Sequence, residues 1–226
     1  MEWVSVIVPT LNEADCIVAT LSRLQGLRRR GHEVIVVDGG STDATRALAG
    51  PLADRVLRTR RGRGRQMRAG AEAARGTVLW FLHADTLAPE EADRHIDRAL
   101  QCTGRAWGRF DVALQGHHPL LRVVGAAMNL RSRLTGIATG DQGLFVRRRL
   151  YDRVGGFPDI ALMEDVALSR RLHRQGRPAC LRQRLITSGR RWDQGGLMAT
   201  IWLMWRLRLA YALGADPAAL ARRYST

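Results

Sequence analysis

The chain has 226 residues and a formal net charge of +15, and all 36 of its basic residues are arginines. A hydrophobic content of 46% and a charged content of 25% are near the averages of globular proteins, which excludes a disordered or collagen-like chain. The positive charge favours anionic partners such as nucleotide phosphates, nucleic acid or acidic lipid headgroups. Three widely spaced cysteines predict buried thiols in a reducing compartment rather than a disulfide framework or a metal cluster.

The first half of the chain alternates strand-like with helix-like segments. β-branched runs predict strands at 4–8, 33–37, 55–57 and 77–82. Amphipathic segments predict helices that begin after Asn12 as the cap, at Asp43, at Arg65 and at Pro89. This alternation is typical of βαβ units, so we expect an α/β fold with a Rossmann-like, mostly parallel central sheet flanked by helices. Ligands of such sheets bind beyond the carboxyl ends of the strands.

The second half is less regular. Its pattern predicts strands at 106–114 and 144–146, helices at 120–134, 165–175 and 195–213, and a polar tail at 215–226. No low-complexity linker divides the chain. We therefore expect one catalytic domain over residues 1–192, followed by a C-terminal helix and tail over residues 193–226.

The C-terminal helix is rich in aromatic residues and arginine. Its apolar stretch over 197–213 is interrupted by Arg206 and Arg208, so it is too broken for a transmembrane helix but suits an interfacial one. It could pack on the catalytic domain, on a second copy of the chain or on an anionic membrane surface, and packing is the commoner use of such a stripe. With no secretory signal in the sequence, we expect a cytoplasmic protein, in the membrane case peripheral on the inner face.

Two strand ends carry polar residues that suit a nucleotide. Asp38 ends the second strand and is followed by two glycines, so its carboxylate could accept from a base N–H or a ribose hydroxyl while the backbone approaches closely. The alternative is a plain turn in which Ser41 or Asp43 caps the next helix. After the fourth strand, Asp85 is placed to hold a divalent cation against a diphosphate. His83 could contact the ribose, join the metal or be half-buried.

Three further segments have the residue types of a transfer site. The pair Glu164 and Asp165, before a helix, could supply a general base for an acceptor hydroxyl, or could only favour the helix start. Asp141 and Gln142 could face the same cleft. The run 190–192 could neutralise a diphosphate through arginine, with its tryptophan as an apolar wall. The glycine-arginine loop over 60–67 could cradle a phosphate or be a solvated basic loop.

Taken in order, these motifs resemble a family 2 glycosyltransferase with the GT-A fold. The matching segments are 4–13, 38–43, 80–85, 140–142 and 164–165, and the resemblance covers about residues 4–192. Within the family the chain is similar to a compact bacterial subgroup that is often labelled an arsenosugar-biosynthesis glycosyltransferase.

The resemblance implies an inverting transfer of a single sugar from a nucleotide-diphosphate sugar, with UDP expected, to an acceptor hydroxyl. Residues implied to bind the nucleotide are Pro9, Thr10, Glu13, Asp38, Arg65 and His83. Asp165 matches the general base, with Glu164 beside it, and Asp85 matches the last acid of the motif that binds Mn²⁺ or Mg²⁺. Here His83 and Ala84 precede Asp85, so one metal-binding carboxylate remains at that strand. Residues implied to face the acceptor or the diphosphate are Asp141, Gln142, Arg191 and Trp192.

Two other functions remain open at this point. A nucleotidyltransferase would use a similar sheet, but such enzymes commonly place lysine on the phosphates and this chain has none. A non-catalytic, arginine-rich module for nucleic acid or membrane would explain the charge. No helix-turn-helix, zinc-finger or aromatic RNA-binding signature is present, so we expect no nucleic-acid partner. The expected partners are the sugar donor, a hydroxyl acceptor, and either a membrane surface or a second copy through 195–213.

Overall fold

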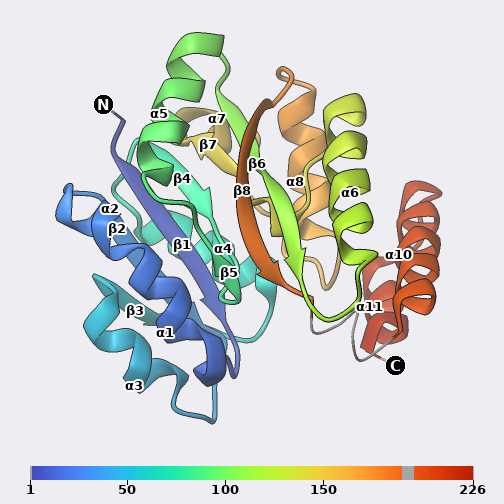
Figure 1. Cartoon of the computed structure of the whole chain (residues 1–226), viewed down its shortest axis with the longest axis horizontal. Helices are drawn as coiled ribbons and strands as arrows, with labels where there is room; N and C mark the ends of the chain where they lie inside the picture. The colour runs from blue at the N-terminus through green and yellow to red at the C-terminus, as the bar shows by residue number, and fades with distance from the viewer. Residues whose placement is uncertain (1, 190–195, 226) are drawn as a thin grey trace.

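The computed structural model describes residues 2–189 and 196–225, which are built around one eight-stranded sheet (Figure 1). The strands are β1 (Val4–Thr10), β2 (Glu33–Asp38), β3 (Arg55–Arg58), β4 (Val78–Phe81), β5 (Thr86–Leu87), β6 (Trp107–Gln115), β7 (Phe145–Arg147) and β8 (Ala179–Ser188). The α-helices are α1 (Ala14–Arg23), α2 (Gln25–Arg29), α3 (Thr45–Ala49), α4 (Arg63–Ala73), α5 (Ala92–Thr103), α6 (Leu121–Thr135), α7 (Arg148–Arg153), α8 (Glu164–His173), α10 (Leu197–Ala212) and α11 (Pro217–Ser225). Two short 3-10 helices are η1 (Gly50–Leu52) and η2 (Gly140–Gln142).

The sheet has a parallel half and a mixed half. Its order is β3-β2-β1-β4-β7-β6-β8-β5. The pairs among β3, β2, β1 and β4 are parallel, as is the pair β6–β8, whereas β7 runs antiparallel to both its neighbours and β5 antiparallel to β8. The predicted α/β fold with a mostly parallel sheet is therefore confirmed. The carboxyl ends of β1, β2 and β4 meet at one edge of the sheet.

Helices cover both faces of the sheet and create two apolar cores. Successive side chains of a strand point to opposite faces, so Val6 packs in the core that includes Leu21 of α1, while Ile7 packs in the core that includes Met67 of α4. Because both faces are covered, every residue of β1 and β2 is buried. This double burial explains the nearly continuous apolar runs of these strands.

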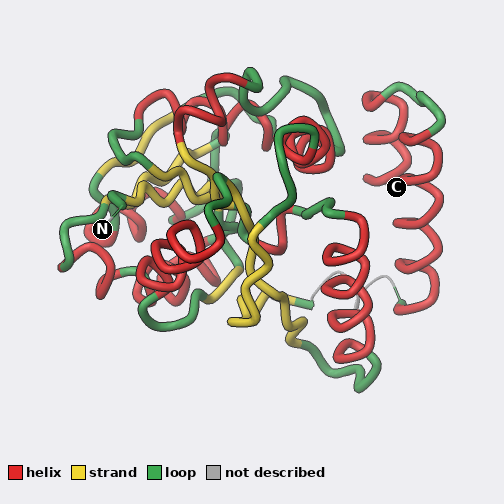
Figure 2. Tube along the Cα trace, turned by 90° about the horizontal axis from the view of Figure 1, so that it is seen from above, coloured by secondary structure: helices red, strands yellow, loops and turns green. Residues whose placement is uncertain are grey.

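The C-terminal helices α10 and α11 form a pair beside α6 and α8 (Figures 1 and 2). A third, smaller core joins Leu207 of α10 and Leu220 of α11 to Met163 and Val166 at the start of α8. The tail predicted for 215–226 is therefore wrong in part, because Pro217–Ser225 is a helix. No helix among the described residues is long and apolar enough to span a bilayer.

The structure differs from the sequence predictions at β8 and at the cysteines. β8 was not predicted, because its central residues are exposed and polar, and it is held by a parallel ladder with β6. Among the cysteines, Cys102 is exposed and Cys16 and Cys180 are half-buried. The prediction that all three thiols are buried is therefore wrong.

Candidate active site

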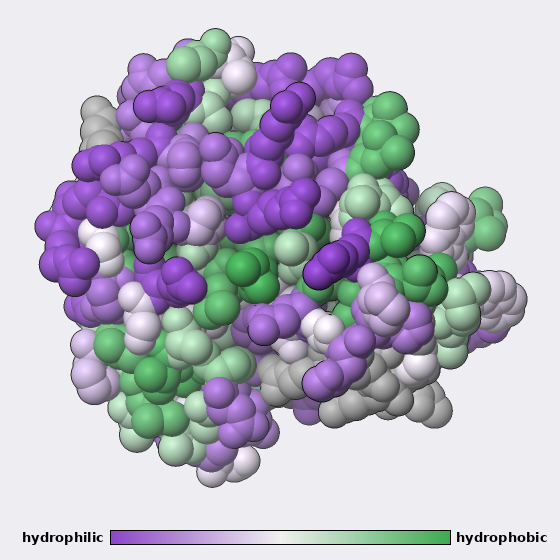
Figure 3. All heavy atoms as spheres, viewed as in Figure 1, coloured by the Kyte–Doolittle hydropathy of each residue, from purple (hydrophilic) through white to green (hydrophobic). Residues whose placement is uncertain are grey.

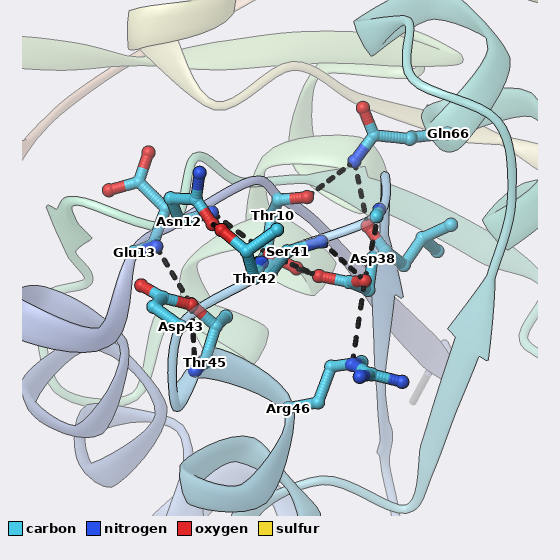
Figure 4. Close-up of polar contacts among 12 residues, drawn as sticks. Thr10, Asn12, Glu13, Asp38, Ser41, Thr42, Asp43, Thr45, Arg46 and Gln66 are labelled. Atoms are coloured by element: carbon cyan, nitrogen blue, oxygen red, sulfur yellow. Dashed lines mark hydrogen bonds and ion pairs between the residues drawn. The ribbon is translucent and has the colours of Figure 1, made fainter.

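The carboxylate of Asp38 organises the turn that follows β2. Its side chain is fully buried, and Oδ2 accepts the N–H groups of Gly40 and Ser41, each at 3.0 Å. Oδ1 accepts the hydroxyl of Ser41 (Figure 4). Gly40 has a φ of 101°, in the region that favours glycine. Asp38 thus holds this turn in shape, a role that the sequence analysis did not assign to it. Its contact with a base or ribose stays a prediction.

The loops that follow β1 and β2 are hydrogen-bonded to each other (Figure 4). The N–H of Asn12 donates to Ser41 Oγ and the Asn12 side-chain oxygen accepts the N–H of Thr42, both at 2.9 Å. The N–H of Glu13 donates to Thr45 Oγ1 at 2.8 Å. The prediction that Asn12 caps α1 is therefore wrong. Its side chain instead ties together the two motifs that the resemblance paired.

Gln66 supports this edge from α4, and the sequence analysis assigned no role to its side chain. Gln66 lies on α4 with only 4% of its surface exposed, and its Nε2 donates to the carbonyls of Thr10 at 2.8 Å and Val37 at 2.9 Å. A Cβ on Gly39 would lie 3.0 Å from Gln66 Cδ, so this position leaves little room for a side chain. Pro9 and Thr10 are buried at the end of β1.

The start of α4 packs against the segment that leads to α8. A Cβ on Gly64 would lie 2.5 Å from the carbonyl oxygen of Pro158, so the two backbones approach too closely for any other residue. Arg65 projects outward and its Nη2 lies 2.8 Å from a carboxylate oxygen of Asp159. Its implied contact with the nucleotide stays a prediction.

Asp85 lines a pocket of about 210 Å³ with polar side chains from three other elements, Asp15 of α1, Gln115 of β6 and Ser188 of β8. Apart from the amide nitrogen of Gln115, these side chains offer oxygen ligands, which Mg²⁺ and Mn²⁺ prefer. Residues 2–189 and 196–225 contain no cluster of three acidic, histidine or cysteine side chains arranged as a metal site. The set fits a cation that completes its shell with substrate phosphates, as Mg²⁺ usually does.

His83 lies on the other side of this strand end, against η2. Its Nδ1 is 3.3 Å from Asp141 Oδ1. Burial alone would raise the pKa of Asp141, but the hydrogen bond from His83 and the positive charges around it outweigh burial, so the pKa lies below its usual range. Asp141 is therefore ionised at neutral pH.

Asp165 is held next to this pair from the start of α8. Its Oδ2 accepts the N–H of Gly140 at 2.6 Å. A Cβ on Gly140 would lie 2.5 Å from His83 Nε2 and 3.6 Å from Asp165 Oδ2, so the histidine ring and the carboxylate both lie against this glycine. The fold thereby brings together side chains from the end of β4, from η2 and from α8. A common cleft for these residues stays a prediction.

Glu164 is the more buried of the two adjacent acids. Only 4% of its surface is exposed, whereas Asp165 is half-buried. Burial and the neighbouring charge of Asp165 raise the pKa of Glu164, while Arg63, with its Nε 3.9 Å from Oε1, acts in the opposite direction. Asp165 is therefore better placed to meet an acceptor.

Gln142 is the last residue of η2, next to Asp141. Gln142 is fully buried; its Oε1 accepts the N–H of Thr139 at 3.2 Å and its Nε2 donates to Asn129 Oδ1 at 3.3 Å. The sequence suggested that this side chain could face a common cleft. In the structure it is buried and holds the turn of η2 in shape. Arg191 and Trp192 lie outside the described residues.

Known proteins resemble the chain in sequence. Residues 5–152 match the family model described as Glycosyl transferase family 2. A Pseudomonas fluorescens (strain Pf0-1) protein named undecaprenyl-phosphate 4-deoxy-4-formamido-L-arabinose transferase is 30% identical over 161 residues, 64% of this chain and 46% of that protein. The poly-beta-1,6-N-acetyl-D-glucosamine synthase of Staphylococcus aureus (strain MSSA476) is 24% identical, over 100% of this chain and 58% of its own length. The chain thus spans about half the length of these curated relatives.

Solved structures share its fold. S. aureus TarS 1-349 in complex with UDP-GlcNAc superposes with a TM-score of 0.67 at 19% identity, over 82% of this chain and 58% of that one. The mannosyltransferase PcManGT from Pyrobaculum calidifontis, solved with GDP-Man and Mn²⁺, has a TM-score of 0.65 at 22% identity, over 98% and 68% of the two chains. The chain therefore belongs to glycosyl transferase family 2 and has the GT-A fold that its sequence predicted.

Proposed function

We propose that the protein transfers a single sugar from a nucleotide-diphosphate sugar to an acceptor hydroxyl, with inversion at the anomeric carbon. Residues 1–192 would form the catalytic domain, with 193–226 as its C-terminal extension. The observation that carries the proposal is the position of Asp165, whose Oδ2 is fixed by the Gly140 N–H at 2.6 Å at the same edge of the sheet as the tied loops of β1 and β2. Family membership favours this function over a nucleotidyltransferase or a binding module.

In this proposal Asp165 takes the proton of the acceptor hydroxyl as that oxygen attacks the anomeric carbon. The nucleoside diphosphate leaves from the opposite face, which inverts the configuration. A proton acceptor in this position typically accelerates a reaction about 100- to 10,000-fold. Glu164, which burial keeps closer to its neutral form, would support the start of α8 rather than accept the proton.

The donor side is supported by neighbours that bind nucleotide sugars, TarS with UDP-GlcNAc and the mannosyltransferase with GDP-Man and Mn²⁺. We propose a UDP-linked donor, bound at the loops of β1 and β2, with Asp85 and Asp15 facing its diphosphate. A divalent cation held there would balance the charge of the leaving group. The narrower resemblance to the arsenosugar-labelled subgroup stays a prediction.

The test is a screen of UDP- and GDP-sugars by thermal shift, with Mn²⁺ and with chelator, followed by proton NMR of the product formed from the best donor. The proposal expects a saturable rise in melting temperature with one nucleotide class and a product of inverted anomeric configuration. A retained configuration would refute the direct displacement at Asp165. Stabilisation by nucleoside triphosphates but not by nucleotide sugars would favour a nucleotidyltransferase.

We also propose that the outer face of α10 contacts an anionic membrane surface. This face exposes Met198, Trp202, Trp205 and Leu209, between 60% and 75% each. The right-hand edge of Figure 3 mixes green hydrophobic spheres with pale ones. The guanidinium of Arg206 lies 4.4 Å from the ring of Trp202, which combines an aromatic residue with a cation, as interfacial helices do. The inner face packs on α8 through Leu207, so the two uses foreseen for this helix are compatible.

Flotation with vesicles of acidic lipid tests this contact. The wild type should float at low salt, and Trp205→Ser should reduce the floated fraction, whereas Val18→Ser, an exposed apolar position on α1, should not. If the protein stays at the bottom and elutes as a dimer, a second copy covers the face and the membrane contact is wrong.

A further inference from the structure

Arg131 is a cation that the fold half-buries. It lies on α6, whose outer stripe is apolar and exposed at Val123, Leu130 and Leu134. The Nε and Nη2 of Arg131 are buried, and neither has a hydrogen-bond partner within the described part of the chain. Buried guanidinium N–H groups normally have an acceptor, because leaving them unpaired is costly.

The charges around Arg131 also favour a bound anion. Burial and the positive charge of Arg208 lower the pKa of Arg131 to about 10, while the negative charge of Asp165 raises it. The site therefore contains an excess of positive charge next to the proposed general base. An anion would restore the balance.

Arg208 brings a second guanidinium to this place from α10. Its Nε is also buried and has no hydrogen-bond partner among residues 2–189 and 196–225. The residue before it, Leu207, packs with Met163 and Val166, which flank the two acids at the start of α8. The positive charge of Arg208 also lowers the pKa of Asp141. Arg208 is thus near enough to Asp141 and to Arg131 for their charges to interact.

Within the described ranges, the acids near these two arginines have other partners. Asp165 accepts the N–H groups of Gly140 and Val166, and Asp141 pairs with His83. Glu164 faces Arg63 and has a raised pKa. Two guanidinium groups with free donors on facing helices suit a phosphate or a carboxylate, which they can bind through charge-assisted hydrogen bonds.

We propose that Arg131 and Arg208 bind an anionic group, a phosphate or carboxylate, carried by the acceptor next to the hydroxyl that Asp165 activates. The donor diphosphate is expected elsewhere, at the Asp85 pocket between α1 and β8. The acceptor is then a phosphorylated or carboxylated alcohol rather than a neutral sugar. This assignment rests on the proposed function, and the same chemistry is found in a soluble phosphate ester and in a lipid phosphate headgroup.

The test uses the full chain and has readouts that do not need turnover. Inorganic phosphate, titrated against chloride at constant ionic strength, should raise the melting temperature of the wild type. Arg131→Met and Arg208→Met should each weaken the apparent phosphate affinity by roughly tenfold or more, since each removes charged hydrogen bonds. Arg122→Met, which removes an exposed charge from the same helix α6, should leave that affinity unchanged.

The phosphate-free proteins give a second readout. Because an unpaired buried cation destabilises the fold, Arg131→Met should melt at a higher temperature than the wild type without phosphate. Sedimentation with phosphatidic acid vesicles, compared with phosphatidylcholine, then separates the two sources. A lipid phosphate predicts binding to the first that is lost in the two arginine variants. A soluble ester predicts stabilisation by inorganic phosphate, with vesicle binding equal in the wild type and the two arginine variants.

Equal phosphate affinity in all four proteins would overturn the proposal. A loss of UDP binding in the two arginine variants would also overturn it, because the arginines would then belong to the donor site. Failure of the proposed function is separate, since it would show as normal turnover in Asp165→Asn while the phosphate titrations stay arginine-dependent.

Discussion

Gly140→Ala is a single-methyl change at the centre of the candidate active site. The added Cβ would lie 2.5 Å from His83 Nε2, closer than carbon and nitrogen can pack, and 3.6 Å from Asp165 Oδ2. The histidine ring or the turn of η2 has to move. Either movement alters the Gly140 N–H bond that fixes Asp165, or the 3.3 Å contact between His83 and Asp141.

The expected cost divides between stability and rate. Overpacking a buried site typically destabilises a protein by about 1–3 kcal/mol. A displacement of roughly 1 Å of a catalytic group can cost about 100-fold in rate. Relief of the clash requires a shift of nearly this size, so we expect a modest loss of stability and about a 100-fold loss of turnover, with donor binding retained.

The assay combines urea unfolding, calorimetry with the donor and initial rates of nucleotide release. Gly50→Ala is the matched control, because nothing lies within 4 Å of its added Cβ and its φ is not in the left-handed region. It should leave rate and binding unchanged and stability unchanged or slightly raised. Full turnover in Gly140→Ala, with the expected destabilisation, would refute the idea that this turn positions Asp165.

Three more outcomes follow from the structure. Asp85→Ala should remove the dependence of donor affinity on Mn²⁺ without altering the unfolding free energy; calorimetry with and without chelator checks this. Asp38→Asn should lower stability by about 1–3 kcal/mol and weaken nucleotide binding, because an amide nitrogen would face donors of the turn; unchanged unfolding and affinity would contradict it. Asp93 is desolvated, but its hydrogen bonds with His32 and Arg30 hold its pKa well below the usual range. The stabilisation of the fold by ionised Asp93 is fully present above about pH 4 and is lost as the pH falls further. Asp93→Asn should therefore flatten the acid limb of the curve of unfolding free energy against pH, measured by circular dichroism.

The parallel half of the sheet could be predicted because its signals are local. β1 and β2 are buried on both faces, so their sequences are apolar at consecutive positions and each ends in a polar loop. The same loops supplied the motifs that resemble the family. The hydrogen bond from the Gly140 N–H to Asp165 could not be predicted from the sequence, because only the tertiary fold brings together these two residues, which are 25 positions apart.

Elements held by long-range contacts were harder to predict. The middle of β8 is exposed and charged, so its strand character comes from the ladder with β6 rather than from an apolar run. Asn12 has the composition of a helix cap, but its φ of 55° and its bond to Thr42 give it another role. The helix α11 could have been found, since Asp216 accepts the N–H groups of Ala218 and Ala219 and Pro217 stands at the first helical position, both typical of a helix start.

Asp165→Asn tests the central claim most directly, with Asp152→Asn, an exposed position on α7, as the matched control. Donor affinity and rate of nucleotide-sugar consumption are measured on the same protein samples. The amide keeps the shape of the side chain but cannot take a proton, so we predict unchanged donor affinity and a rate about 100- to 10,000-fold lower than in the wild type and the control. A rate in Asp165→Asn close to that of the wild type would contradict the assignment of Asp165 as the general base.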